Sequence, residues 1–126
     1  MKTFFTMLTG NATISLIILI GGIFICKYTP RKINSLIGYR SARSMKNMDT
    51  WKFANRYCGR LWITVGIPLT AAAVLVHTLL IKKSDEIVSA VGLSFMFVSL
   101  ALLILSLILT ERAIKRNFND DGSRKN

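Results

Sequence analysis

The feature that most constrains this chain is a set of three long stretches without a charged side chain. They cover residues 3–26, 61–81 and 87–110, and so contain 24, 21 and 24 residues. A helix rises about 1.5 Å per residue, so each stretch is long enough to cross a hydrocarbon layer about 30 Å thick. The sequence therefore predicts an all-α integral membrane protein with a bundle of three transmembrane helices. It excludes a soluble globular domain and a disordered basic tail.

The charged residues lie between and after these stretches. The chain has 17 Lys and Arg against 6 Asp and Glu, a formal net charge of +11 combined with a mean hydropathy of +0.45. Residues 27–60 hold nine of the basic residues and the segment after residue 110 holds five, which leaves three elsewhere. Lys and Arg accumulate in cytoplasmic loops. We therefore predict a multi-pass protein of the bacterial cell membrane, with its N-terminus outside and its C-terminus in the cytoplasm.

The predicted organisation is a single membrane domain with a structured cytoplasmic loop and a juxtamembrane amphipathic helix before the second span. That helix places Trp51 and Trp62 on one face and Lys52, Arg56 and Arg60 on another, where basic side chains can meet anionic lipid headgroups. A cleaved signal peptide does not fit the first stretch, which is too long and lacks an A-x-A-like site. The predicted boundaries are 1–126 for the domain, about 4–27, 61–81 and 87–110 for the spans, 28–60 for the loop and 111–126 for the tail.

Small and polar residues recur along one face of each predicted span. Lipid tails are as apolar as Leu, so membrane helices associate through small residues and shared polar groups. These faces predict close packing, either within one bundle or between the chains of a homo-oligomer. The residues are Asn11, Ser15 and Gly22 in the first span, Gly59, Gly66 and Ala73 in the second, and Ser89, Gly92, Ser99 and Ser106 in the third.

Two polar side chains inside the spans, Asn11 and His77, are candidates for more than packing. An ionisable residue within a membrane is a functional candidate because its burial costs free energy. His77 stands four residues from the end of its stretch, so a position among lipid headgroups is the alternative. The spans contain no Asp or Glu, which argues against a proton-coupled multidrug exporter.

The predicted loop is longer than a connector between neighbouring helices needs to be, which indicates structure of its own. Pro30 disfavours helix at the residue before it, and Gly38 can adopt a turn conformation that other residues resist. Asn47 and Asp49 are both candidates for the N-cap of the next helix. We expect Trp51 to lock the loop against the bundle.

Arg40 is the basic residue of the loop that we single out. Its planar, permanently charged fork suits phosphate or carboxylate, and Ser41 adds a neighbouring donor. We expect Asn34 and Asn55 to close the turn around it through hydrogen bonds to backbone groups. Two interpretations stay open for Arg40: a binding site for a partner or anionic ligand, and a structural role in which it satisfies carbonyls or a lipid phosphate.

An ordered set of loop residues resembles the signature of the SdpI family of bacterial membrane proteins. The run N-S-L-I-G-Y-R-S is followed by S-M-K-N and then W-K-F-A-N. The family motif has the form N-x-x-x-G-x-R-T, a short spacer with Ser and Asn, then Trp and a small-polar pair. Ser41 stands where Thr is usual. The resemblance covers about residues 15–110 and implies the following binding residues, here called the signature residues: Asn34, Gly38, Tyr39, Arg40, Ser41, Asn47, Trp51 and Asn55.

The family is named for an immunity protein against a sporulation-delay toxin. The resemblance therefore implies a non-enzymatic protein that protects the cell from a membrane-active peptide toxin or bacteriocin, with anionic lipids and a peptide toxin as partners. We expect a short form without the N-terminal membrane unit of longer members, to which a signalling role is attached. The alternatives are a small oligomeric transporter, an anionic-lipid-binding membrane subunit, or a membrane sensor that sequesters a cytoplasmic regulator.

The sequence lacks the patterns of an enzyme, a metal site or a cofactor site. It contains no Gly-rich phosphate loop, no clustered carboxylates and no nucleophile with a base at hand. Cys26 and Cys58 lie at predicted cytoplasmic ends of spans, where a disulfide is not expected, and have no His or carboxylate cluster beside them. We expect no nucleic acid partner, because topology already explains the basic residues next to the spans.

Overall fold

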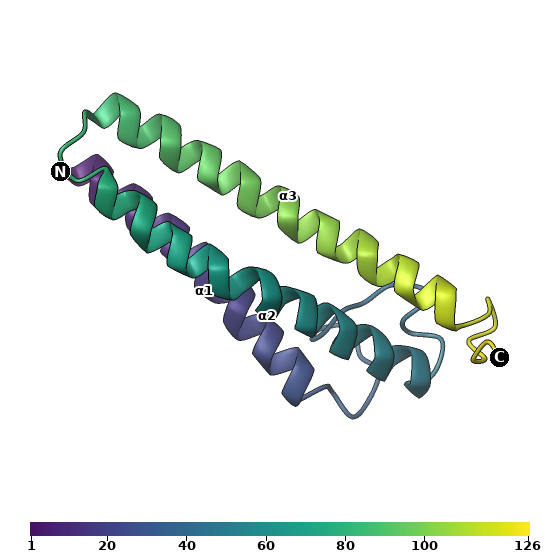
Figure 1. Ribbon diagram of the computed structural model, residues 1–126. Coiled ribbons are helices and arrows are strands. Elements are labelled where there is room, and N and C mark those ends of the chain that lie inside the picture. Colours follow the sequence, from purple (N-terminus) through teal and green to yellow (C-terminus); the bar gives the residue numbers. More distant parts are fainter.

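The computed structural model describes all 126 residues and consists of three long helices. Helix α1 covers Lys2–Lys27, α2 covers Met48–Leu79 and α3 covers Asp85–Asn117. They lie side by side, up, down and up, with the two chain termini at opposite ends of the bundle (Figure 1). All three are long and apolar enough to cross a membrane. The prediction of an all-α, three-span membrane protein is confirmed.

Two of the helices continue beyond the uncharged stretches. The predicted amphipathic segment and the second span form one uninterrupted helix of 32 residues, which runs through Pro68. Helix α3 continues past Thr110 to Asn117, and the chain then folds back so that Phe118 and Arg124 pair as an isolated bridge. Charged residues can extend a helix out of the membrane. Here Lys115 and Arg116 in the last turn stabilise the helix end, because cations interact favourably with the negative end of the helix dipole. The segment between α1 and α2 is therefore shorter than the predicted loop.

Helix α2 begins with a reciprocal pair of N-capping hydrogen bonds. The Asn47 side chain accepts a hydrogen bond from the backbone N–H of Thr50 at 2.9 Å, and the Thr50 hydroxyl accepts one from the backbone N–H of Asn47 at 3.1 Å. Such an exchange satisfies two backbone donors that a helix start leaves free. Of the two candidates, Asn47 is the N-cap, and Asp49 lies in the first turn.

The small-residue faces meet one another inside the bundle. A Cβ added to Gly22 would lie 2.9 Å from the carbonyl oxygen of Gly59, and one added to Gly66 would lie 2.8 Å from the Cα of Leu19. Helices α1 and α2 therefore approach backbone to backbone. Ser89 is half-buried, and the other predicted face residues are buried within the chain: Asn11, Ser15, Gly22, Gly59, Gly66, Ala73, Gly92, Ser99 and Ser106. These faces are therefore no argument for a homo-oligomer.

His77 is buried between the helices, near the end of α2. Its side chain is 0% exposed, its Nδ1 lies 2.8 Å from the Ala73 carbonyl oxygen, and its Nε2 lies 3.4 Å from Nδ2 of Asn11. The same Asn11 nitrogen donates to the Gly92 carbonyl at 3.0 Å. This pattern fits a neutral imidazole with its proton on Nδ1. The side chain of His77 therefore faces the other helices, which the sequence distance from a helix end does not reveal.

Candidate functional site

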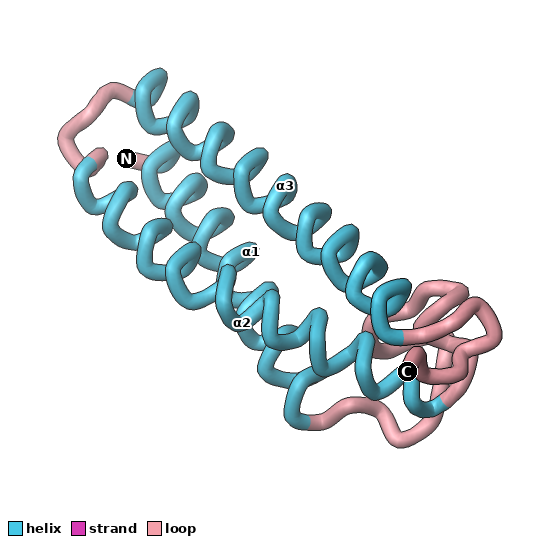
Figure 2. Tube along the Cα trace, turned by 45° about the vertical axis from the view of Figure 1, so that its right-hand side comes forward, coloured by secondary structure: helices cyan, strands magenta, loops and turns pink.

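The signature residues gather at one end of the bundle. Residues 28–47, here called the cap, run from the end of α1 to the start of α2 and lie beside the last turns of α3 (Figure 2). Asn11 and His77 lie far from the cap, close to the other end of the bundle. The sequence candidates therefore form two separate groups and not one site.

The first part of the cap is a turn held by Asn34 and Arg40. The Asn34 side-chain oxygen accepts hydrogen bonds from the backbone N–H groups of Leu36 and Ile37 at 3.0 and 2.8 Å. This is a turn-forming arrangement in which the side chain takes the place of a backbone acceptor. Arg40 donates from Nη1 to the carbonyl of Ser35 and is otherwise exposed. Its partner in the chain is thus a backbone carbonyl and not a carboxylate.

Gly38 and Asn55 fit the cap onto α2. Gly38 has a φ of +104°, in the left-handed region, and a Cβ there would collide with Oδ1 of Asn55. That oxygen accepts a hydrogen bond from the backbone N–H of Tyr39 at 2.7 Å, while the Asn55 amide donates to the Trp51 carbonyl at 2.9 Å. Asn55 is fully buried, and an unpaired buried polar group costs about 1–3 kcal/mol. Glycine at position 38 therefore makes room for the asparagine that holds the cap.

Trp51 connects the cap to the end of α1. Its side chain is 0% exposed, and its indole Nε1 donates to the Pro30 carbonyl at 2.9 Å. Pro30 follows shortly after the last residue of α1, so this single side chain joins α2 to the chain leaving α1. Trp51 thus combines a large buried apolar surface with one polar contact, the combination that suits a tryptophan in an interior.

Two serines and a threonine close the second part of the cap. The backbone N–H of Ser41 donates to the Ser44 hydroxyl oxygen at 2.7 Å, and the backbone N–H of Ser44 donates to the Ser41 hydroxyl oxygen at 3.1 Å. The Thr50 hydroxyl donates to the Ser44 carbonyl at 3.0 Å. Asn47 donates from its amide to the Gly122 carbonyl at 2.8 Å and so holds the C-terminal segment beside the cap.

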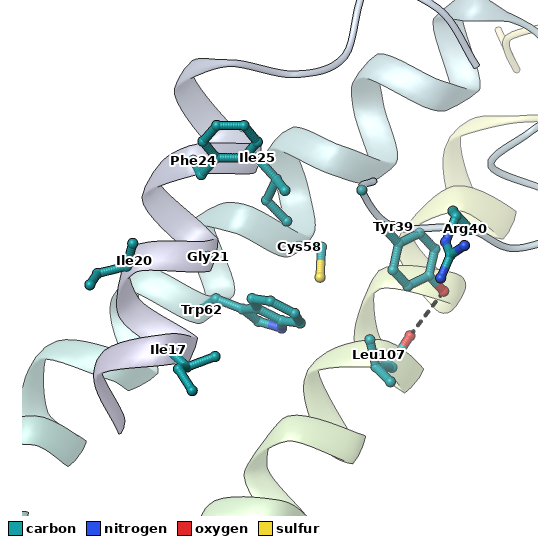
Figure 3. Close-up of a pocket in the computed structure, with 11 residues that line it drawn as sticks. Ile17, Ile20, Gly21, Phe24, Ile25, Tyr39, Arg40, Cys58, Trp62 and Leu107 are labelled. Atoms are coloured by element: carbon teal, nitrogen blue, oxygen red, sulfur yellow. Dashed lines mark hydrogen bonds between the residues drawn. The ribbon is translucent and has the colours of Figure 1, made fainter. Parts of the chain in front are cut away.

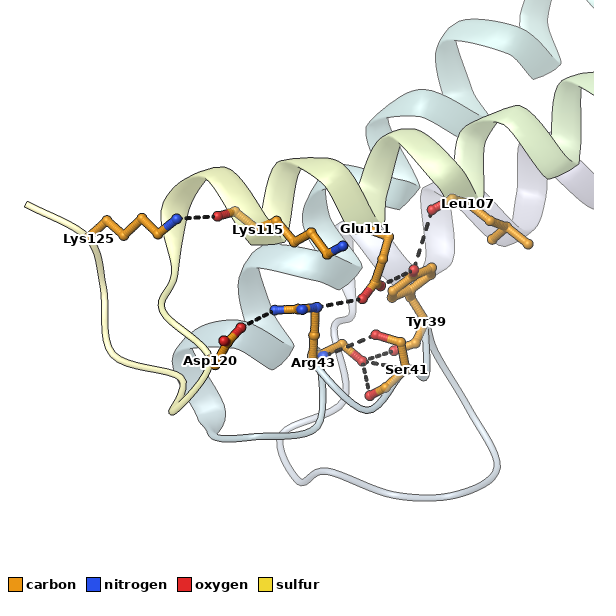
Figure 4. A network of polar contacts seen from close by, with 9 residues as sticks. Tyr39, Ser41, Arg43, Leu107, Glu111, Lys115, Asp120 and Lys125 are labelled. Carbon is orange, nitrogen blue, oxygen red and sulfur yellow. Dashed lines mark hydrogen bonds and ion pairs between the residues drawn. The ribbon is translucent and has the colours of Figure 1, made fainter.

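A charged network ties the cap to α3 (Figure 4). The Tyr39 hydroxyl donates to Oε2 of Glu111 at 2.7 Å, and Arg43 Nε lies 3.5 Å from the other Glu111 oxygen. Arg43 also reaches Oδ1 of Asp120 at 2.8 Å. Burial is the main cause that raises the pKa of Tyr39 well above its ordinary value, and the hydrogen bond to Glu111 is the second. The phenol therefore keeps its proton and remains a donor. The Arg43 hydrogen bond lowers the pKa of the exposed Asp120.

A groove opens below the cap, between α1 and α3 (Figure 3). It has a volume of about 660 Å³ and is mostly apolar, with Gly38, Tyr39 and Arg40 of the cap among its lining residues. Cys58 and Trp62 of α2 also line it, and the Trp62 indole donates to the Ser106 hydroxyl at 2.9 Å. Three signature residues therefore border an apolar groove at the side of the bundle.

The charged network contains two residues that sequence reasoning missed, Arg43 and Glu111. Arg43, and not Arg40, makes the carboxylate contacts of the cap. The available signal is the position of Glu111, the first charged residue after the third uncharged stretch, at an end of the chain rich in basic residues. Cys26 and Cys58 are free thiols, and no three His, Cys, Asp or Glu side chains gather as metal ligands.

The sequence is similar to those of known proteins. The model of the SdpI/YfhL protein family matches residues 31–110, which include most of the cap, all of α2 and most of α3. The uncharacterized protein YfhL of Bacillus subtilis (strain 168) is 33% identical over 91 residues, which is 71% of this chain and 83% of YfhL. No solved structure matches the chain.

Proposed function

The chain belongs to the SdpI/YfhL family, and from that premise we propose that it protects bacterial cells against a membrane-active peptide toxin or bacteriocin, without catalysing a reaction. The observation that carries the proposal is the exposed tip of the cap. Leu36 and Ile37 are 83% and 50% exposed beside the exposed Arg40, and the tip rests on a cap that is hydrogen-bonded to α2 and α3. A surface that combines apolar and cationic side chains suits recognition of an amphipathic peptide.

The mode of action follows from the chemistry of the bilayer. A peptide that crosses a membrane must satisfy its own backbone hydrogen bonds, so it presents a helix with exposed side chains and a polar end at each face. The cap tip offers apolar side chains and one cation to such an end. Every buried side-chain polar atom of the bundle already has a hydrogen-bond partner, so the scaffold behind the tip is satisfied internally. Protection then comes from binding alone.

The proposal places the cap at the cytoplasmic face. Fourteen of the 17 Lys and Arg belong to residues 27–60 or follow residue 110, at the cap end of the bundle. A reporter fused to the C-terminus tests this: a reporter active in the cytoplasm should work there, and one active outside should not. The reverse result would put the cap on the outer face.

The direct test is survival of sensitive cells that express the chain and are challenged with membrane-active peptide toxins. Expression should raise survival, and Leu36→Ser or Arg40→Ala should abolish the gain without lowering the amount of protein in the membrane. Leu79→Ser is the matched control, because Leu79 is a 70% exposed leucine at the opposite end of the bundle. It should leave protection unchanged.

The proposal is contradicted if the chain protects against none of the toxins tested. Two further measurements then discriminate between a sensor and a transporter. A sensor would bring a soluble protein into the membrane fraction, and this transfer should depend on the cap tip. A transporter would move a solute across the membrane of vesicles that contain only this chain.

A further inference from the structure

We propose that the groove between α1 and α3 binds one anionic phospholipid from the leaflet on the cap side, with the phosphate on Arg40 and an acyl chain along the groove. This site shares Arg40 with the cap tip, but lipid binding in the groove does not require a toxin and is measured without one. It gives a lipid ligand to an apolar groove that the proposed protective function does not use.

The groove has the length of one leaflet. A second cavity of about 370 Å³ continues the groove of about 660 Å³ toward the middle of the bundle, and Ile17 lines both. On α3 the two cavities extend from Leu107 to Met96, a rise of about 16 Å. The hydrocarbon layer is about 30 Å thick, so one leaflet contributes about half of that. An acyl chain that starts at the cap therefore ends where the groove ends.

The deep part of the groove offers nothing to a polar ligand. Ser99 is the one polar residue that lines the second cavity, and its hydroxyl donates to the Phe95 carbonyl at 2.8 Å. The walls include Ile17 on α1 and Phe97 on α3, which are 63% and 64% exposed and so face the lipid. Hydrocarbon satisfies these walls without leaving a polar group unpaired.

The rim of the groove holds an arginine without an anionic partner. Arg40 is the one charged residue that lines the larger cavity, and its contact within the chain is a hydrogen bond to the Ser35 carbonyl. The carboxylate of Glu111 is already engaged by Tyr39 and Arg43. A guanidinium has five N–H donors, so Arg40 keeps most of its capacity for the oxygens of a phosphate. The polar rim above an apolar groove repeats the order of headgroup and acyl chain in a phospholipid.

A second copy of this chain suits the groove less well. Its exposed apolar helix faces could cover the deep part, but its spans contain no Asp or Glu that could pair with Arg40. A soluble phosphate compound would engage Arg40 and leave the apolar part empty. An anionic phospholipid satisfies both parts at once.

Trp62 provides the measurement, because it lines the groove whereas the other tryptophan, Trp51, is 0% exposed. In vesicles of phosphatidylcholine with brominated acyl chains, bromine quenches Trp62 fluorescence, and unbrominated phosphatidylglycerol relieves the quenching as it displaces the first lipid. We expect phosphatidylglycerol to be preferred over unbrominated phosphatidylcholine by about fivefold, the ratio expected for one basic residue near an anionic headgroup.

Three variants separate the site from general surface charge. Arg40→Gln should bring the preference close to one. Arg56→Gln removes the same charge from an exposed position that lines a different depression, and should retain the preference. Arg40→Lys keeps the charge without the planar fork and should retain part of the preference, which keeps the test decisive if the Gln variant does not fold.

Equal losses of preference in the Arg40 and Arg56 variants would overturn the proposal, because attraction to a charged surface would then explain the result. A wild-type preference of one would overturn it as well. Native mass spectrometry supplies an independent readout: one phosphatidylglycerol should stay bound per chain. A lipid-free dimer would instead assign the groove to a second copy and contradict the proposal.

Discussion

The two ends of the bundle are held by polar contacts of opposite kinds. At the cap end, Arg43, Glu111 and Asp120 join the cap to α3 with charged groups, and the side chains of the first two are about a third exposed. At the other end, Asn11 and His77 join the three helices with neutral groups that are 3% and 0% exposed. Charged pairs near water are screened and weak, whereas buried neutral groups find no substitute partner in lipid. We therefore expect the bundle to depend more on these neutral contacts than on the charged ones.

Removing the tryptophan beneath the cap should have the largest effect. Trp51→Ala takes away a fully buried side chain and the hydrogen bond to Pro30, and should lower the free energy of unfolding by about 3–5 kcal/mol. Unfolding in mixed detergent micelles measures it. Leu79→Ala, at a largely exposed leucine, is the control and should cost little. A small effect of Trp51→Ala would mean that the cap is not fastened through this residue.

Breaking the neutral contacts at the other end should come next. Asn11→Leu removes the donor to His77 and to the Gly92 carbonyl, and should lower the free energy of unfolding by about 1–2 kcal/mol. The loss should not change with salt, because no ion pair is involved. The double variant with His77→Leu should cost less than the sum of the two single variants. Additive losses would show that the two side chains do not act together.

Neutralising the carboxylate at the cap end should cost less. Glu111→Gln keeps an acceptor for the Tyr39 hydroxyl but removes the charge that faces Arg43, so we expect a loss below about 1 kcal/mol. High salt should make the variant and the wild type more alike, since salt screens exposed pairs. The comparison of the two ends fails if this loss exceeds that of Asn11→Leu or is insensitive to salt.

The smallest effect concerns Asp120, whose pKa the Arg43 hydrogen bond lowers in the folded state. A lowered pKa contributes stability above the ordinary pKa of aspartate, near 3.9, and this contribution is lost as the pH falls through the folded value. Between pH 5 and pH 3 the wild type should therefore lose slightly more stability than Asp120→Asn. Identical acid profiles of the two proteins would remove Asp120 from the network.

The sequence was most informative where a local rule suffices. The uncharged stretches predict the helices because a backbone in lipid must satisfy its own hydrogen bonds. Spacing alone predicts Gly22 and Gly66 as contact positions, because residues on one helix face follow the helical period whatever covers them. Asn47 is recognisable as an N-cap candidate of the following helix for the same reason, because N-capping involves only the next three residues.

The remainder depended on neighbours that are distant in the chain. Arg40 and Arg43 stand three residues apart in the same loop, and only the position of the end of α3 decides that Arg43 meets Glu111. His77 is buried because α1 supplies Asn11, 66 residues earlier, at the same depth. The groove likewise exists only once α1, α3 and the cap are assembled.

The uncharged stretches and the small-residue spacing by themselves determined that this chain is a three-helix membrane bundle and which face of each helix packs closely against a neighbour. The tertiary structure alone decided which arginine is paired, which is left free above a groove, and that the histidine lies inside. The physical reason is one of range. Helix formation and face polarity arise from residues within a turn or two of one another, whereas a polar side chain is partnered by whatever packing brings within about 3 Å.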